Sequence, residues 1–199
     1  MGVFQRVCFL ALIAVTSVSA AQKQDAAAAP PQMRPDSPIF SLAELAAKVP
    51  APKADDVKSL DAILHAAYDS ISGAAGPRDW MRFRSLFLPQ ARFTQVGKGP
   101  DGSTFVISWG VEEFIRDAGI IFAKDSFYEN AIINKDYSYG GMTQVLSSYE
   151  SKRTRDGKPF ERGVNSFQLL NDGNRWWIVS IFWDSERPDN PLPAALQKR

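Results

Sequence analysis

The chain has 199 residues, of which 45% are hydrophobic and 23% are charged, a composition typical of a globular domain. Its formal net charge of +1 falls to 0 when a leader containing Arg6 is removed, so we expect no nucleic-acid partner. With one cysteine, inside that leader, and one histidine, the chain predicts no disulfide framework, no metal site and no cofactor.

Residues 1–21 are typical of a signal peptide. Arg6 precedes an apolar run over residues 7–15, and small residues follow as far as Ala20. That run is shorter than the roughly 20 residues that cross a bilayer, so we expect cleavage, export to the periplasm or the medium, and no stable membrane span afterwards. Residues 22–54 are rich in alanine and proline and predict a tether, with one short helix starting at the capping-box sequence of residues 41–44.

Residues 55–186 carry the pattern of one folded domain. Apolar side chains recur at steps of three and four over residues 57–71, and similar stripes over residues 77–88 and 111–122 predict a second and a third helix. Alternating segments at residues 91–96 and 104–109 predict a hairpin before the third helix. The proline-rich residues 187–199 predict a loose tail.

After the third helix the sequence predicts only strands. They cover residues 127–137, 142–154, 160–170 and 175–183, and glycine-containing turns separate them. The predicted fold class is therefore α+β, with a strongly curved antiparallel sheet of about six strands packed against three helices.

Two Asp-Gly turns predict how the last three strands pair. A two-residue turn at residues 172–173 places Asn165 opposite Ser180, and one at residues 156–157 places Ser148 opposite Asn165, giving a polar row on an apolar face. The other face of the last hairpin is also apolar, and we predict that a second copy of the chain covers it in a homodimer. The residues of this predicted interface are Val164, Trp177, Val179, Ile181 and Trp183.

The order of elements over residues 55–186 resembles the nuclear transport factor 2-like superfamily, in its polyketide-cyclase-like and ketosteroid-isomerase-like branch. Trp80 with the sequence of residues 86–91 carries the resemblance, as does the Asp-Gly turn followed by Trp176 and Ile178. The resemblance implies a cone-like barrel around an apolar pocket, often in a homodimer, and this fold hosts enzymes, binding modules and assembly domains.

The resemblance also implies where isomerase chemistry would lie. That chemistry uses a carboxylate base on the first strand and an oxyanion hole containing a tyrosine, for which Tyr68 is the counterpart. Gln95 stands at the position of the base, and its amide cannot abstract a proton. The resemblance implies that dehydratase chemistry in this family would use a pair of histidines with an aspartate. This chain has a single histidine, His65.

Three functions stay open from the sequence. We favour binding of a small, largely apolar or amphipathic molecule without catalysis, in a pocket formed by Tyr68, Ser148, Asn165 and Ser180. The second is a cofactor-independent lyase or isomerase, for which no catalytic residue is assigned and the candidates are His65, Tyr68, Glu129 and Glu150. The third is a purely dimeric interaction domain, which requires that side chains fill the cone.

Overall fold

The computed structural model describes residues 40–197 of the chain. The predicted signal peptide and most of the predicted tether lie outside these residues. No helix of the described part is long and apolar enough to cross a membrane. The helices are α1 (Leu42–Ala46), α2 (Ala54–Val57), α3 (Leu60–Ile71), α4 (Trp80–Ser85), α5 (Val111–Lys124) and the 3-10 helix η1 (Ala194–Leu196).

Local capping explains where these helices begin. The Ser41 hydroxyl accepts a hydrogen bond from the Glu44 backbone N–H, and the Glu44 carboxylate accepts one from the Ser41 N–H, so the predicted capping box at α1 is confirmed. The Ser59 hydroxyl caps α3 and separates it from α2, where the sequence predicted one continuous helix. Asp79 caps α4, which therefore begins at Trp80 and not at Pro77, the predicted start of the second helix.

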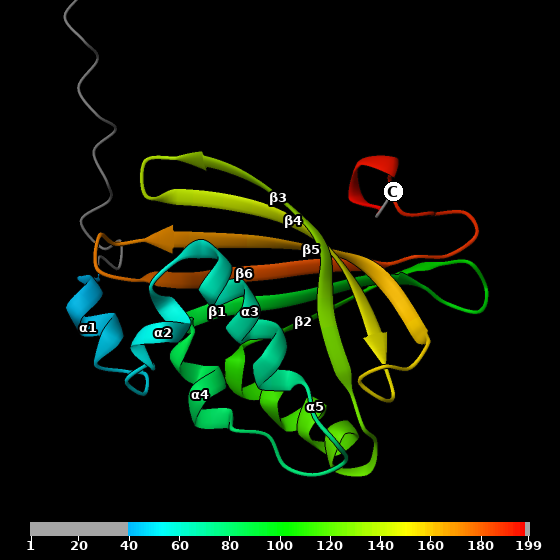
Figure 1. Cartoon of the computed structure of the whole chain (residues 1–199), viewed down its shortest axis with the longest axis horizontal. Coiled ribbons are helices and arrows are strands. Elements are labelled where there is room, and N and C mark those ends of the chain that lie inside the picture. Colours follow the sequence, from blue (N-terminus) through cyan, green and yellow to red (C-terminus); the bar gives the residue numbers. More distant parts are fainter. Residues whose placement is uncertain (1–39, 198–199) are drawn as a thin grey trace, which may run out of the picture. The chain divides into compact units, whose positions relative to one another are not determined.

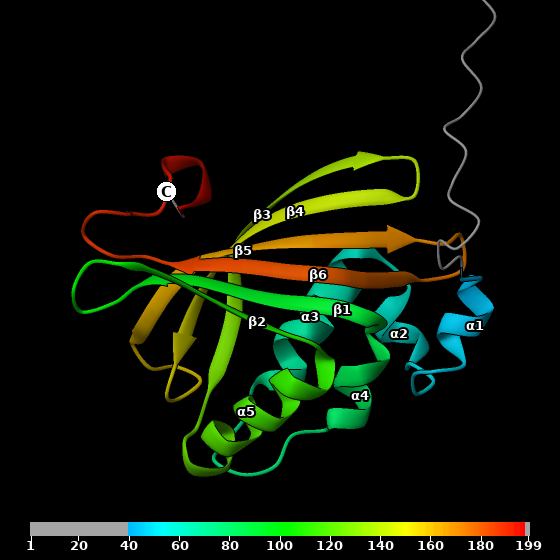
Figure 2. The same ribbon diagram turned by 180° about the vertical axis from the view of Figure 1, so that it is seen from behind.

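Six strands form a single sheet in the order β2-β1-β6-β5-β4-β3 (Figure 1). All neighbouring strands are antiparallel except β1 and β6, which run parallel and join the first hairpin to the meander (Figure 2). The α+β prediction with a curved six-stranded sheet is confirmed. The strands are β1 (Phe87–Lys98), β2 (Thr104–Trp109), β3 (Tyr128–Tyr139), β4 (Met142–Lys152), β5 (Pro159–Asn171) and β6 (Trp176–Ser185).

The curved sheet wraps around α3, α4 and α5, and we call the side that faces these helices the inner face. Three phenylalanines from different elements stack between the helices and the sheet: Phe93 lies 4.5 Å from Phe114 and 5.8 Å from Phe83, measured between ring centroids. This aromatic cluster anchors α4 and α5 on β1 and forms one wall of the space beneath the sheet.

The register predicted for the last hairpin is wrong. Its loop contains four residues, 172–175, because the Asp172 carboxylate accepts hydrogen bonds from the N–H groups of Asn174 and Arg175, each at 2.8 Å. Val179 is then left unpaired as a bulge. The residues that face Asn165 and Ser180 are therefore Trp183 and Gln168, respectively.

The predicted pairing of β4 with β5 is wrong by one residue. Ser147 lies opposite Asn165, and Ser148 lies opposite Val164. Because side chains alternate along a strand, this slip moves Ser148 to the outer face, where its hydroxyl contacts the backbone of Ile133 in β3.

The C-terminal segment packs against the domain, in contrast to the predicted loose tail. Leu192 and Leu196 are buried, and the Leu192 N–H donates to the Glu186 carboxylate at 3.1 Å. Helix η1 contacts β3 and lies on the opposite side of the sheet from α3 and α5 (Figure 1). This segment therefore covers part of the outer face.

Candidate functional site

A cavity of about 500 Å³ lies between the inner face of the sheet and helices α3 and α5. Its size is in the range of small-molecule sites. Its wall is rich in phenylalanine and tryptophan side chains, which are Phe83, Phe87, Phe93, Trp109, Phe114, Phe122, Phe127, Phe160, Phe167 and Trp183. The cone is therefore open, which argues against an interior filled by side chains.

One polar group in the cavity is a hydrogen-bonded cluster from three elements. The Tyr68 hydroxyl, on the buried stripe of α3, lies 2.6 Å from the Ser147 hydroxyl of β4. The Asn165 side-chain amide of β5 donates to the same Tyr68 oxygen at 3.1 Å. Burial raises the pKa of Tyr68 above its usual value, and Glu129 adds to the effect, so the phenol stays protonated at neutral pH.

A second polar group is a row across three neighbouring strands, which we call the acidic row: Glu129 on β3, Ser151 on β4 and Glu161 on β5. Ser151 is paired with both glutamates in the sheet register, and all three line the cavity. The Ser151 hydroxyl donates to the Glu129 carboxylate at 2.7 Å. The Glu161 carboxylate accepts from Tyr149 and from Ser185, at 3.1 and 2.6 Å.

Among the carboxyl groups of the cavity, Glu129 has the most strongly perturbed pKa. Burial raises its pKa to about 7, and the nearby Glu161 adds to the increase, while hydrogen bonds from Ser151 and Asn165 oppose it. At neutral pH the group is thus poised between its protonated and ionised forms, as a proton acceptor or a hydrogen-bond donor.

Gly163 makes room for the Tyr149 side chain, which crosses β5 to reach Glu161. A Cβ atom at position 163 would lie 2.6 Å from the Tyr149 hydroxyl oxygen and 2.5 Å from the Asp184 carbonyl oxygen. Burial and the nearby Glu161 raise the pKa of Tyr149 above its usual value, so this hydroxyl also remains a donor.

Half of the predicted pocket residues line the cavity. Tyr68 and Asn165 do so and contact each other. Ser148 is on the outer face, and Ser180 pairs with Gln168 away from the cavity wall. The predicted row of Ser148, Asn165 and Ser180 therefore does not form, because the predicted registers of β4 with β5 and of β5 with β6 are both wrong.

The catalytic candidates divide in the same way. Tyr68 and Glu129 line the cavity, whereas His65 is exposed on α3. Glu150 is on the outer face of β4, where its carboxylate lies 2.8 Å from the Lys152 ammonium group. Gln95 lines the cavity, at the position where the resemblance implies a base.

The five residues of the predicted dimer interface do not share one face. Ile181 and Trp183 line the cavity, because the bulge at Val179 reverses the alternation of β6. Trp177 is buried at the other end of the strand, with the Arg175 guanidinium group 3.6 Å from its ring centroid. Val164 and Val179 are partly exposed.

On the inner face of β4 and β5, four polar residues at or beside the cavity were absent from the sequence prediction: Ser147, Tyr149, Ser151 and Glu161. The correct β4–β5 register would have identified them, since it places each on the inner face together with Asn165. The signal for that register is the six-residue loop after β4, which is longer than the assumed two-residue turn. Within residues 40–197, no cluster of three or more metal-ligating side chains exists.

No protein-family model matches the sequence, and no curated protein matches it. Among solved structures, a protein of unknown function from Mycobacterium tuberculosis is 14% identical, with a TM-score of 0.50 over 68% of this chain and 75% of that chain. NTF2-like proteins of unknown function from Silicibacter pomeroyi and Shewanella baltica are 15% and 16% identical, with TM-scores of 0.43 and 0.42. The alignments cover 65% of this chain in both cases, and 94% and 98% of those two chains, respectively.

At these identities the likeness concerns the fold alone. The curvature of the six-stranded sheet and the helices on its inner face agree with the cone-like barrel that the resemblance implies. The described part of the chain has the cone-like fold of the nuclear transport factor 2-like proteins.

Proposed function

We propose that the cavity binds a small, largely apolar molecule that carries one polar end. The observation that supports the proposal is an open space of about 500 Å³ with aromatic walls and few polar groups. The apolar body of the ligand would contact the phenylalanine and tryptophan side chains. Its polar end would meet Tyr68, Asn165 and the acidic row.

A titration with 4-phenylbutan-1-ol tests this proposal. Trp109 and Trp183 stack 5.9 Å apart beside the cavity, so their fluorescence should change saturably when the probe binds. Asn165→Leu removes a polar group of the cavity, and we expect it to weaken binding by about 1 to 3 kcal/mol. Gln168→Leu, at an outward-facing position of the same strand, should leave the affinity unchanged. If neither alcohols, amines nor carboxylic acids of this size bind, the proposal is wrong.

A second candidate function is proton transfer, which the position and raised pKa of Glu129 favour. Glu129 would remove a proton next to a carbonyl group, and the Tyr68 hydroxyl would donate to the developing oxyanion. The test is exchange of the α-protons of 4-phenylbutan-2-one in D2O, followed by NMR. Protein-catalysed exchange that Glu129→Gln abolishes, while the ketone still binds, would establish catalysis; the absence of exchange with bound ketone would leave binding alone.

We also propose export, from the pattern of residues 1–21. The exported protein should begin at Ala21 or Gln22, and its intact mass tests this. Recovery of the full-length chain from membranes would show that the segment is an uncleaved anchor.

A further inference from the structure

The charges that line the cavity have an unequal balance of sign. Within residues 40–197, its charged side chains are Asp117, Glu129, Glu161 and Arg153. Three are acids and one is a base. The sign of these charges influences whether the polar end of a ligand is favoured as a cation, a neutral group or an anion.

The single base already has partners. The Arg153 guanidinium group lies 4.4 Å from the Phe160 ring centroid, and one of its nitrogens donates to the Ser126 carbonyl oxygen. Asp117 is likewise engaged, since it accepts from the Trp109 indole and forms an ion pair with Arg116. The two glutamates of the acidic row have partners of a different kind from those of Arg153 and Asp117.

Neither Glu129 nor Glu161 forms an ion pair with any residue of the described part of the chain. Their partners are neutral hydroxyl and amide groups, from Ser151, Asn165, Tyr149 and Ser185. The two carboxylates have only neutral donors, and the partners of Arg153 are a ring and a carbonyl oxygen, so acids outnumber bases where the acidic row faces the cavity. An anionic ligand is disfavoured there, and a cation would relieve the repulsion.

We infer that the ligand of this cavity is a hydrophobic amine, whose ammonium group binds at the acidic row and whose apolar body fills the aromatic part. The inference rests on the proposed binding function and specifies its ligand class. Geometry supports it, because the two glutamates flank Ser151 on adjacent strands and face the same space. The aromatic wall adds attraction, since ring faces bind ammonium groups.

The protonation of Glu129 provides an independent readout. Its pKa of about 7 means that roughly half of the molecules carry this proton at pH 7. An ammonium group favours the carboxylate form, so binding should release up to about half a proton at that pH. The other titratable groups that line the cavity are Tyr68 of α3, Asp117 of α5, Tyr149 of β4, Arg153 of the β4–β5 loop and Glu161 of β5.

The experiment measures the affinity of residues 22–199 for three probes of similar size. The probes are 4-phenylbutylamine, 4-phenylbutan-1-ol and 4-phenylbutanoate. At pH 8 we expect the amine to bind at least tenfold more tightly than the alcohol, and the carboxylate most weakly. Calorimetry in two buffers of different ionisation enthalpy should show the proton release at pH 7. The preference for the amine should shrink at pH 6, where Glu129 is mostly protonated.

Glu129→Gln and Glu161→Gln should each reduce the ratio of amine affinity to alcohol affinity to less than threefold. Glu150→Gln is the matched control, because it removes a carboxylate from the outer face of β4 and should keep the preference. An amine that binds no more tightly than the alcohol, or a preference that survives both cavity variants, overturns the inference and leaves the binding function intact. If none of the three probes binds, both proposals fail.

Discussion

A carboxyl group inside an aromatic cavity is stable as an anion only when a cation or several donors meet it. Glu129 has the Ser151 hydroxyl as a donor, and a second carboxylate lies nearby. Its pKa rises from 4.5 to about 7 on folding, so the folded state binds more protons than the unfolded state in that interval. The contribution of Glu129 to stability is therefore highest below pH 4.5 and falls as the pH rises to 7.

Glu129→Gln keeps the shape of the side chain and removes its titration. We expect the wild type to be less stable than this variant at pH 8 by roughly 3 kcal/mol, and the difference to disappear near pH 4.5. Urea unfolding at both pH values measures it. Glu150→Gln, on the outer face, should not reproduce the effect. A difference that is the same at both pH values would show that Glu129 titrates normally in the folded protein.

Gly163 matters because of space, since its backbone conformation is one that other residues adopt. In Gly163→Ala the new methyl group would meet the Tyr149 hydroxyl and the Asp184 carbonyl oxygen at less than 3 Å. We expect a loss of about 1 to 3 kcal/mol in unfolding free energy, together with weaker binding in the cavity. Gly119→Ala is the control. Gly119 lies in α5, and a methyl group there would meet Trp80 at 3.8 Å, an ordinary van der Waals distance. Equal stability of the two variants in denaturant titrations would contradict the steric argument.

At the scale of elements, the β5–β6 loop depends on one side chain. The Asp172 carboxylate accepts from two backbone N–H groups of the loop and from the Trp177 indole at 2.8 Å. Although burial acts to raise the pKa of Asp172, these hydrogen bonds hold it below its usual value. Its stabilising contribution is therefore present above the unfolded pKa and is lost as the pH falls through the folded one.

Two Asp-Gly loops of the meander allow a matched comparison. We expect Asp172→Ala to cost about 1 to 3 kcal/mol in unfolding free energy, because it leaves loop N–H groups and a buried indole without an acceptor. Asp156→Ala changes the exposed β4–β5 loop and should stay within about 0.5 kcal/mol of the wild type. Thermal or urea unfolding of both variants gives the answer, and similar losses would mean that the Asp172 hydrogen bonds do not support the hairpin.

These loops also explain what the sequence could and could not predict. Periodicity correctly predicted the third helix and the existence of all six strands, because burial of one face imposes it. Register depended on loop length. A four-residue loop, a bulge at Val179 and a slip of one residue after β4 reversed the faces of Ser148 and Ile181. The cavity followed from the resemblance, but its acidic row required the true pairing of β3, β4 and β5.

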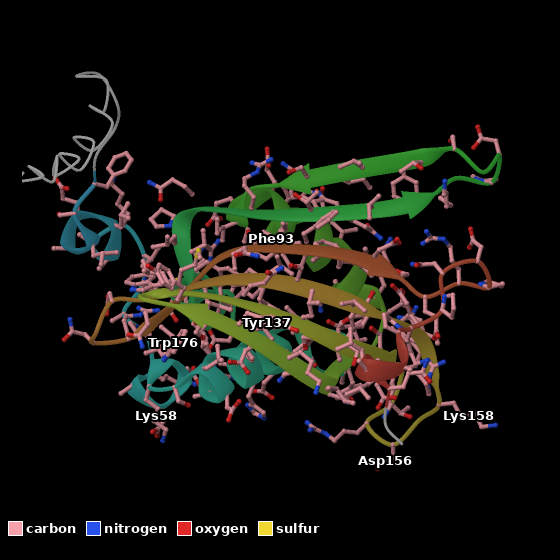
Figure 3. The ribbon with its side chains drawn as sticks, turned by 90° about the horizontal axis from the view of Figure 1, so that it is seen from above. Lys58, Phe93, Tyr137, Asp156, Lys158 and Trp176 are labelled. Carbon is pink, nitrogen blue, oxygen red and sulfur yellow. The ribbon has the colours of Figure 1, made fainter. Side chains whose placement is uncertain are left out.

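At the scale of the whole molecule, the outer face of the sheet is only partly covered. The C-terminal segment with Leu192 and Leu196 packs there against β3. Elsewhere on this face, Phe182 is 49% exposed and Val179 is 37% exposed. Figure 3 looks onto the sheet from above, with Tyr137 labelled on β3. Apolar side chains on an uncovered sheet face are typical of an interface.

We propose that two copies of the chain pair through this part of the outer face, centred on β6. Of the residues first predicted for the interface, Val164 and Val179 fit this position, whereas Ile181 and Trp183 line the cavity. A standard interface would bury on the order of 1,200 to 2,000 Å² in total.

Val179→Asp tests the dimer, because it places a charge at the centre of the expected contact without reaching the cavity wall. Sedimentation equilibrium at micromolar concentration should show a dimer for the wild type and a monomer for the variant. Met81→Asp is the control, since Met81 is 60% exposed on α4, away from the sheet, and its variant should still dimerise. The fluorescence titration of the cavity should be unchanged in a monomeric Val179→Asp protein, because the cavity lies within one chain. A wild-type protein that sediments as a monomer shows instead that the C-terminal segment and solvent cover this face.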